Sequence, residues 1–119
     1  MKIADPWKQI ITEQFLKTTI RTPSRFSLPP SSQRFLLEQM CRAFPLNKSI
    51  QIRPLRLAGL RAEEIKPETE ATQLILHIHG GAFFLGSMNT HRAFVSDLAA
   101  STQMQVIHLD YPLSPEHPY

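Results

Sequence analysis

The sequence predicts an α/β fold that contains a β-α-β unit of a mostly parallel sheet. Two nearly continuous apolar runs of strand length, residues 73–79 and 104–110, are typical of strands buried inside such a sheet. Between them, residues 89–102 repeat apolar side chains at helical spacing. A strand, a helix and a strand in this order predict two parallel strands joined by the helix.

Two helices are predicted ahead of this unit. The first spans residues 5–19, where Asp5 suits the N-cap and Pro6 the first helical position. The second spans residues 31–43 and ends before Pro45. The apolar side chains at helical spacing are Trp7, Ile10, Ile11 and Phe15 in the first helix and Phe35, Leu36, Met40 and Ala43 in the second. Two such helices cannot form a core alone, so we expect them to pack on another part of the fold.

A β-hairpin is predicted between the helices and the β-α-β unit. Residues 49–53 alternate as a half-buried strand does, and Pro54 either ends that strand or confines it to a sheet edge. Gly59 marks a turn, and residues 60–65 form a second strand. A polar break at residues 66–70 separates the hairpin from the first buried strand.

Within the β-α-β unit, the helix is expected to begin with Asn89 or Thr90 as its N-cap. Its buried side is predicted to consist of Phe94, Val95, Leu98 and Ala99. In the second strand, His108 is expected to be a core or half-buried histidine.

Composition excludes several classes of protein. The chain has 119 residues, of which 42% are hydrophobic and 19% charged, which is ordinary for a globular protein and too apolar for disorder. The single cysteine, Cys41, excludes an internal disulfide and a cysteine-rich zinc site. No apolar run has the length of a membrane span, and residues 1–7 lack the apolar core of a signal peptide. We therefore expect a cytoplasmic protein with no integral membrane segment.

The net charge of +3 is unevenly distributed. Residues 1–66 hold 12 of the 13 Lys and Arg residues but only 5 of the 10 acidic residues. A basic half could bind nucleic acid, and strongly salt-dependent DNA binding would reveal that function. The positive residues are scattered rather than clustered, however, so solvated helix faces are the favoured interpretation and no nucleic-acid partner is expected.

The candidate site follows the first buried strand. Gly80 and Gly81 stand at its carboxyl end, where open α/β sheets bind ligands. A glycine pair there lets the backbone turn sharply and lets a ligand approach its N–H groups. Convergent N–H donors can stabilise an oxyanion. No nucleotide-binding glycine motif is present.

Two motifs around this site resemble those of a known family. The run His79-Gly80-Gly81-Ala82-Phe83 resembles the HGGG motif of the hormone-sensitive-lipase-like carboxylesterases, which have the α/β-hydrolase fold. Residues 110–118, Asp-Tyr-Pro-Leu-Ser-Pro-Glu-His-Pro, resemble that family's D-Y-R-L-A-P-E-H-P segment. His91 and Arg92 resemble its usual H-R pair. The resemblance is tight over residues 73–119 and looser over 1–72.

The resemblance implies roles for individual residues. The N–H groups of Gly81 and Ala82 would be donors of an oxyanion hole that faces the carbonyl oxygen of an ester. His79 and Gly80 would orient the loop, and Tyr111 and Glu116 would support it from beneath. Three positions depart from the family pattern: Ala82 replaces the third glycine, Pro112 the usual Arg and Ser114 the usual Ala. The Ala82 methyl narrows the allowed backbone angles, and any ion pair made by that Arg is absent.

No catalytic triad is identified. None of Gly59, Gly80, Gly81 and Gly86 can frame the G-x-S-x-G of a nucleophile elbow. The resemblance implies that the elbow, the acid and the triad histidine lie beyond Tyr119, so the chain itself holds no catalytic residue and requires no cofactor. We expect a partial α/β-hydrolase fold, truncated before the elbow: a fragment of a carboxylesterase or lipase for short- to medium-chain acyl esters, inactive alone. Residues 1–48 would begin its helical cap and residues 49–119 its core.

Truncation would expose one strand. The family's strand order is 1-2-4-3-5-6-7-8, so residues 73–78 would be strand 3, and its outer neighbour would be missing. An unpaired apolar edge is prone to pair with another chain. The alternative function is therefore a non-catalytic binding or complementation module, and we expect the isolated chain to be marginally folded or self-associated.

A metal site is a further alternative. His77 and His79 lie on one face of the predicted strand, and His91 or Asp110 could supply a third ligand. The Gly-Gly context already accounts for His79, so no metal is expected.

Overall fold

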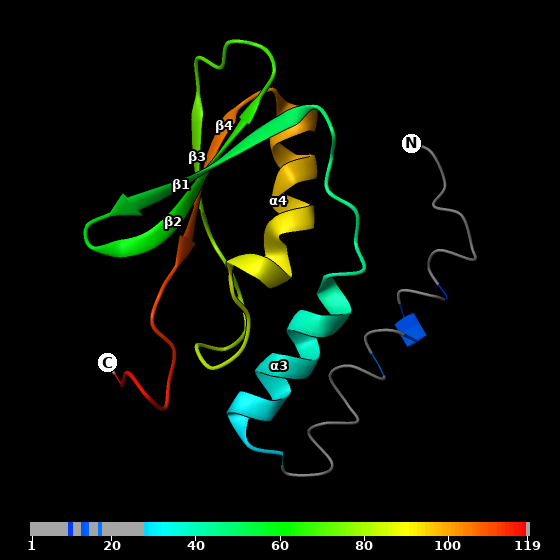
Figure 1. The fold of residues 1–119 in the computed structure, drawn as a ribbon, viewed down its shortest axis with the longest axis vertical. Coiled ribbons are helices and arrows are strands. Elements are labelled where there is room, and N and C mark those ends of the chain that lie inside the picture. The colour runs from blue at the N-terminus through cyan, green and yellow to red at the C-terminus, as the bar shows by residue number, and fades with distance from the viewer. Residues whose placement is uncertain (1–9, 11–12, 15–16, 18–27, 119) are drawn as a thin grey trace.

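The computed structural model describes residues 10, 13–14, 17 and 28–118 (Figure 1). The elements within residues 28–118 are α3 (Pro30–Cys41), β1 (Ile50–Leu57), β2 (Leu60–Pro67), β3 (Leu74–Ile78), α4 (Met88–Thr102) and β4 (Gln105–Asp110). The helix predicted for residues 5–19, with its Trp7 and Phe15, lies almost wholly outside the described residues.

The four strands form one sheet in the order β1-β2-β4-β3. β1 and β2 are an antiparallel hairpin, β2 pairs antiparallel with β4, and β4 pairs parallel with β3. The hairpin, the parallel pair and the edge position of the 73–78 segment are thus confirmed. Pro54 lies within β1, an edge strand, so a proline without a backbone N–H is tolerated there.

α4 packs on one face of the sheet (Figure 1). The core between them consists of Ile65 and Val106 from the sheet and Val95 and Ala99 from α4, all four 0% exposed. Three half-buried side chains flank this core: Ile50, Ile52 and Ile75. The predicted buried side of α4 is therefore confirmed for Val95 and Ala99.

The opposite face of the sheet is uncovered by any described helix. There Leu74, Leu76 and Ile78 of β3 are 58%, 50% and 61% exposed. Beside them, a small buried cluster of Ala62, Ile107 and Leu109 belongs to the central strands. The continuous apolar run of β3 predicted cover on both faces, and for the described residues that prediction is wrong.

Three helix predictions also need correction. Phe35 and Leu36 were expected to form the buried face of α3, yet they are 63% and 44% exposed, because this helix contacts the fold mainly through polar side chains. Phe94 is 59% exposed, because it lies beside His77 at the last strand of the sheet. The N-cap of α4 is Ser87 rather than Asn89 or Thr90: its hydroxyl accepts from the Thr90 N–H, while the Thr90 side chain accepts from the Ser87 N–H.

Two isoleucine truncations test which face of the sheet is covered. Ile65→Ala should lower the free energy of unfolding by about 2–5 kcal/mol, because it leaves a cavity under α4. Ile78→Ala, at an exposed position, should cost less than about 0.5 kcal/mol. Urea unfolding of dilute protein measures both. Equal losses would show that the open face is covered in solution.

Candidate functional site

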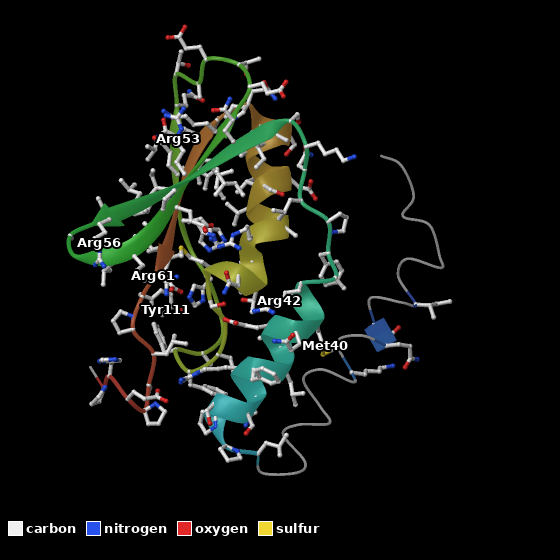
Figure 2. The ribbon with its side chains drawn as sticks, in the orientation of Figure 1. Met40, Arg42, Arg53, Arg56, Arg61 and Tyr111 are labelled. Carbon is white, nitrogen blue, oxygen red and sulfur yellow. The ribbon has the colours of Figure 1, made fainter. Side chains whose placement is uncertain are left out.

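The parallel pairing of β3 with β4 brings two predicted site residues together. His79 follows β3 and Tyr111 follows β4, at the same edge of the sheet. The Tyr111 hydroxyl donates a 2.6 Å hydrogen bond to the His79 carbonyl oxygen, and the two rings stack with centroids 4.3 Å apart. Figure 2 shows Tyr111 just beyond the end of β4.

The loop between β3 and α4 has a strained backbone. Gly81 has φ 127°, and the next two residues, Ala82 and Phe83, have φ 52° and 63°. A left-handed conformation costs a non-glycine residue about 1–2 kcal/mol. Gly81 is required, because a Cβ there would lie 2.0 Å from the Leu85 carbonyl oxygen. The Ala82 methyl thus sits on a backbone that glycine would adopt without strain.

Short hydrogen bonds close this loop. The Gly81 carbonyl oxygen accepts from the N–H of Leu85 at 2.8 Å and from that of Phe84 at 3.1 Å. Within residues 28–118, neither the Gly81 N–H nor the Ala82 N–H donates to a protein acceptor. The loop therefore presents two successive backbone donors that remain free to bind an anion or a polarised carbonyl oxygen.

Two partners from distant segments hold the loop carbonyls. The Ser114 N–H donates to the Phe83 oxygen at 2.8 Å, and Arg34 Nε of α3 donates to the Phe84 oxygen at 2.7 Å. The same guanidinium donates to the Ser114 oxygen and, at 2.9 and 3.0 Å, to both carboxylate oxygens of Glu116. Among residues 28–118, the predicted support residue Glu116 is thus linked to the loop through Arg34.

Four histidines lie behind the loop. His79 is sandwiched between Tyr111 and His91 of α4, whose ring centroid is 5.4 Å away. His77 and His108 face each other across the parallel pair, with centroids 4.8 Å apart. His108 is 0% exposed, so of the two environments expected for it, core or half-buried, the structure shows the core.

Burial favours the neutral imidazole at three of these positions, His77, His91 and His108. Both ring nitrogens of His108 are buried without a hydrogen-bond partner, as are His77 Nδ1 and His79 Nε2. Burial, reinforced by the neighbouring histidines and Arg92, lowers the pKa of His108 to about 3. Burial also lowers the pKa values of His77 and His91. Protonation of His108 would place charge where no described group accepts a hydrogen bond from its ring.

The cluster does not have the arrangement of a metal centre. Among the described residues, no three His, Cys, Asp or Glu side chains form a group able to hold a metal ion. Asp110, weighed as a third ligand, instead accepts from the Met88 N–H at the start of α4. His79 Nδ1 lies 2.9 Å from the Gly80 oxygen, to which its protonated tautomer can donate.

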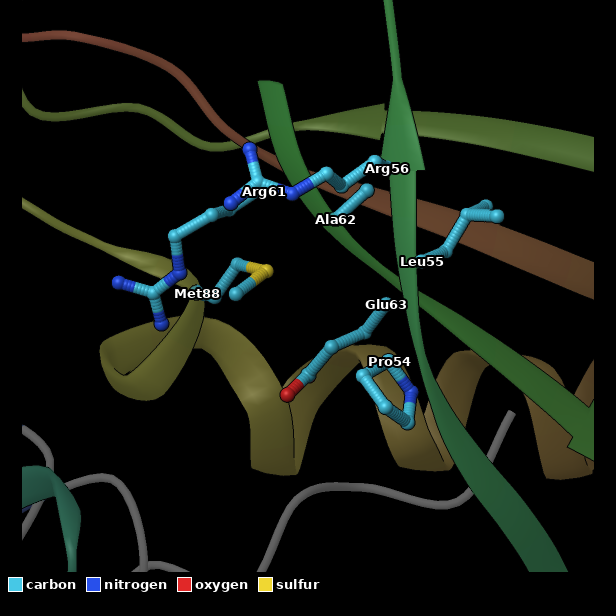
Figure 3. A pocket seen from close by; sticks show the side chains of 7 residues that line it. All are labelled: Pro54, Leu55, Arg56, Arg61, Ala62, Glu63 and Met88. Carbon is cyan, nitrogen blue, oxygen red and sulfur yellow. The ribbon is translucent and has the colours of Figure 1, made fainter. Parts of the chain in front are cut away.

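A hollow of about 390 Å³ lies elsewhere, under the hairpin (Figure 3). Its lining consists of Pro54, Leu55, Arg56, Arg61, Ala62, Glu63 and Met88. None of these residues belongs to the loop that follows β3, so this hollow is separate from the two free N–H groups.

Two polar residues at the site were not identified from the sequence. Arg34 was taken only as one of several scattered positive charges, because its partners lie 50 to 82 residues away. Glu63 is buried on β2, where it forms a two-pronged ion pair with Arg92. The sequence signal that could have indicated a buried ion pair at Glu63 was the position of this charged residue within a predicted strand.

Comparisons with known proteins agree with this geometry. A family model described as an alpha/beta hydrolase fold matches residues 75–119. An esterase of Acinetobacter venetianus is 65% identical to the chain over 119 residues, which are 100% of this chain and 39% of that protein. The chain thus spans about two fifths of the length of this relative.

Solved structures give the same result. The crystal structure of an esterase from the bacterial hormone-sensitive lipase family is 31% identical, with a TM-score of 0.84, over 98% of this chain and 39% of its own. The esterase EstE5, in a crystal soaked with p-nitrophenyl butyrate, is 32% identical with a TM-score of 0.79, over 98% of this chain and 38% of its own.

The buried histidines should make the fold acid-sensitive. Unfolded histidines take up protons below about pH 6.5, whereas His108 stays neutral in the fold down to about pH 3. Stability is therefore present above pH 6.5 and lost as the pH falls, by at least about 2 kcal/mol between pH 7.5 and pH 5. Urea unfolding across this range measures the loss.

Two variants show whether the cluster causes this loss. His108→Phe should flatten the pH dependence, because it removes the group with the most depressed pKa. His117→Gln, at an exposed position, should leave it unchanged. A stability that stays constant from pH 7.5 to pH 5 in the unsubstituted chain would contradict the neutral cluster.

Proposed function

Because the chain belongs to the esterase family related to hormone-sensitive lipase, with an α/β-hydrolase fold, we propose that it supplies the oxyanion hole of a carboxylic ester hydrolase. Gly81 and Ala82 would donate their N–H groups to the carbonyl oxygen of an acyl ester as negative charge develops on it. The observation that carries the proposal is the pair of unpartnered backbone donors at the carboxyl end of β3.

Other residues would hold these donors in place. Tyr111 supports the loop through its bond to the His79 carbonyl oxygen, and the stacked His79 ring fixes the start of the turn at Gly80. Glu116 acts through Arg34. Residues 1–48 would belong to a helical cap and residues 49–119 to the hydrolase core, so α3 would reach from the cap to the oxyanion loop.

The reaction needs groups that these 119 residues do not supply. Acyl transfer requires a nucleophile activated by a base, and the sequence contains no G-x-S-x-G. We propose that the chain alone is inactive and contributes to hydrolysis of short- to medium-chain esters only with the rest of a hydrolase. No described helix is long and apolar enough to cross a membrane. A cytoplasmic location and the absence of a cofactor stay predictions.

A chimera tests this function. The chain replaces the matched residues of the Acinetobacter venetianus esterase, to which it is 65% identical. The chimera should hydrolyse p-nitrophenyl butyrate, and Gly81→Ala should lower its kcat about 10²–10³-fold, because the new Cβ collides with the Leu85 carbonyl and displaces the donors. The 119-residue chain alone should show no turnover above buffer.

The chimera's Arg42→Gln variant, exposed just after α3 (Figure 2), serves as the control and should keep its activity. An inactive chimera, or one that Gly81→Ala leaves fully active, would refute the proposed oxyanion hole. Turnover by the chain alone that a serine reagent abolishes would refute its inactivity.

The alternative function is a complementation module that pairs through β3. Among the described residues β3 has a partner strand on one side only, and its Leu74, Leu76 and Ile78 are at least half exposed. An unpaired, apolar edge favours association with another chain.

Sedimentation velocity of the chain at about 10–100 μM should therefore show species larger than a monomer. Leu76→Lys should shift the distribution toward monomer, because a charge on the edge opposes pairing. Lys48→Ala, at an exposed position away from β3, is the control. A monodisperse monomer that melts cooperatively would argue against this alternative.

A further inference from the structure

The oxyanion loop cannot keep its conformation by local preference. Ala82 and Phe83 both occupy the left-handed region, which residues with a side chain rarely adopt in succession. The bonds from the Phe84 and Leu85 N–H groups to the Gly81 oxygen span this strained pair and close the turn that contains it. Contacts from outside the loop add to these two bonds in balancing the strain.

The outside contacts converge on one side chain. The Phe83 and Phe84 carbonyl oxygens face Ser114 and Arg34, respectively. Arg34 also donates to the Ser114 oxygen, so Ser114 is tied to the loop by its own N–H and to α3 by its carbonyl. The guanidinium thus joins the loop, the 111–116 segment and the helix.

The position of α3 makes this junction rigid. Four residues along the helix from Arg34, the Glu38 carboxylate accepts a 2.8 Å hydrogen bond from the hydroxyl of Ser87, the N-cap of α4. One face of α3 is therefore fixed to both ends of the segment between Phe84 and Ser87. The Arg34 side chain is only 22% exposed, and its Nη1 donates to both carboxylate oxygens of Glu116.

Only a guanidinium can make this set of bonds. It offers five donors in a flat fork, of which Arg34 aims Nε at Phe84, Nη1 at Glu116 and Nη2 at Ser114. A lysine could approach Glu116 but has one nitrogen in place of three. Pro112 stands where the family motif carries its Arg, and in this chain a guanidinium from α3 reaches Glu116.

We propose that Arg34 is the positioning residue of the oxyanion loop: it fixes the Phe84 carbonyl to the 111–116 segment and so keeps Gly81 and Ala82 in the conformation that leaves their N–H groups free. The inference rests on the proposed function, because it assigns Arg34 a part in forming the oxyanion hole. It couples the helix of the proposed cap directly to the catalytic loop.

Steady-state kinetics of the chimera test whether Arg34 contributes to catalysis by positioning the loop. Arg34→Gln should lower kcat for p-nitrophenyl butyrate at least about tenfold and leave KM within about twofold, since the donors act on the charge that develops in the transition state. Arg34→Lys should lower kcat similarly, because charge alone does not restore the three-way bridge. Arg42→Gln, at the opposite end of α3, should change neither constant.

A rescue experiment separates positioning from general stability. Ala82→Gly in the Arg34→Gln chimera should recover kcat at least about threefold, because glycine adopts the left-handed backbone without a holding contact. If Arg34→Gln leaves kcat unchanged, the inference is overturned. A loss of kcat that accompanies a lower melting temperature and that Ala82→Gly does not relieve would also overturn it.

Amide hydrogen exchange tests the role of Arg34 without a measurement of enzyme activity. In the 119-residue chain, Arg34→Gln should speed exchange of the Leu85 and Ser114 amides at least about tenfold relative to the Val106 amide of β4. Arg42→Gln should not. An inactive chimera would refute the proposed function alone, whereas equal Leu85 and Ser114 exchange in both variants would refute the role of Arg34 whatever the kinetics.

Discussion

The parallel pairing of β3 with β4 is the constraint on which the site depends. It aligns the carboxyl ends of two strands, so that the chain leaves the sheet at His79 and at Tyr111 side by side. The loop after β3 then lies against the segment after β4, and the Ser114 N–H can reach the Phe83 carbonyl oxygen. Because β4 also pairs with β2, this junction rests on the buried centre of the sheet rather than on its exposed edge.

Two kinds of polar group lie against the loop, one charged and partly exposed to solvent, the other buried and uncharged. On the outer side, Arg34 and Glu116 carry charge and remain partly exposed, where solvent offsets the cost of that charge. On the inner side, His108 is fully buried with both ring nitrogens unpartnered, and burial lowers its pKa to about 3. The bonds to the Gly81 oxygen span Ala82 and Phe83, and the Ser114 N–H holds the Phe83 oxygen, so two left-handed residues persist in succession.

The sequence predicted the strands, their pairing and the glycine turn, because apolar periodicity and glycine spacing are local signals. It did not predict which apolar side chains face solvent, since Leu76 and Phe35 look like core residues until the neighbouring elements are known. It also missed Arg34, whose partners at Phe84 and Glu116 become neighbours only through the tertiary fold. The capping role of Ser87 could have been predicted from the sequence, because Ser87 and Thr90 have capping-box spacing.

The central claim is that these residues hold the oxyanion loop preformed. Backbone ¹⁵N relaxation of the 119-residue chain tests it most directly, with the Ala82 and Phe83 amides as probes and the Val106 amide of β4 as the reference. We expect order parameters of about 0.85 at all three positions, as in rigid backbone. Values below about 0.6 at Ala82 and Phe83, with Val106 rigid, would show a loop that is not preformed and would contradict the account.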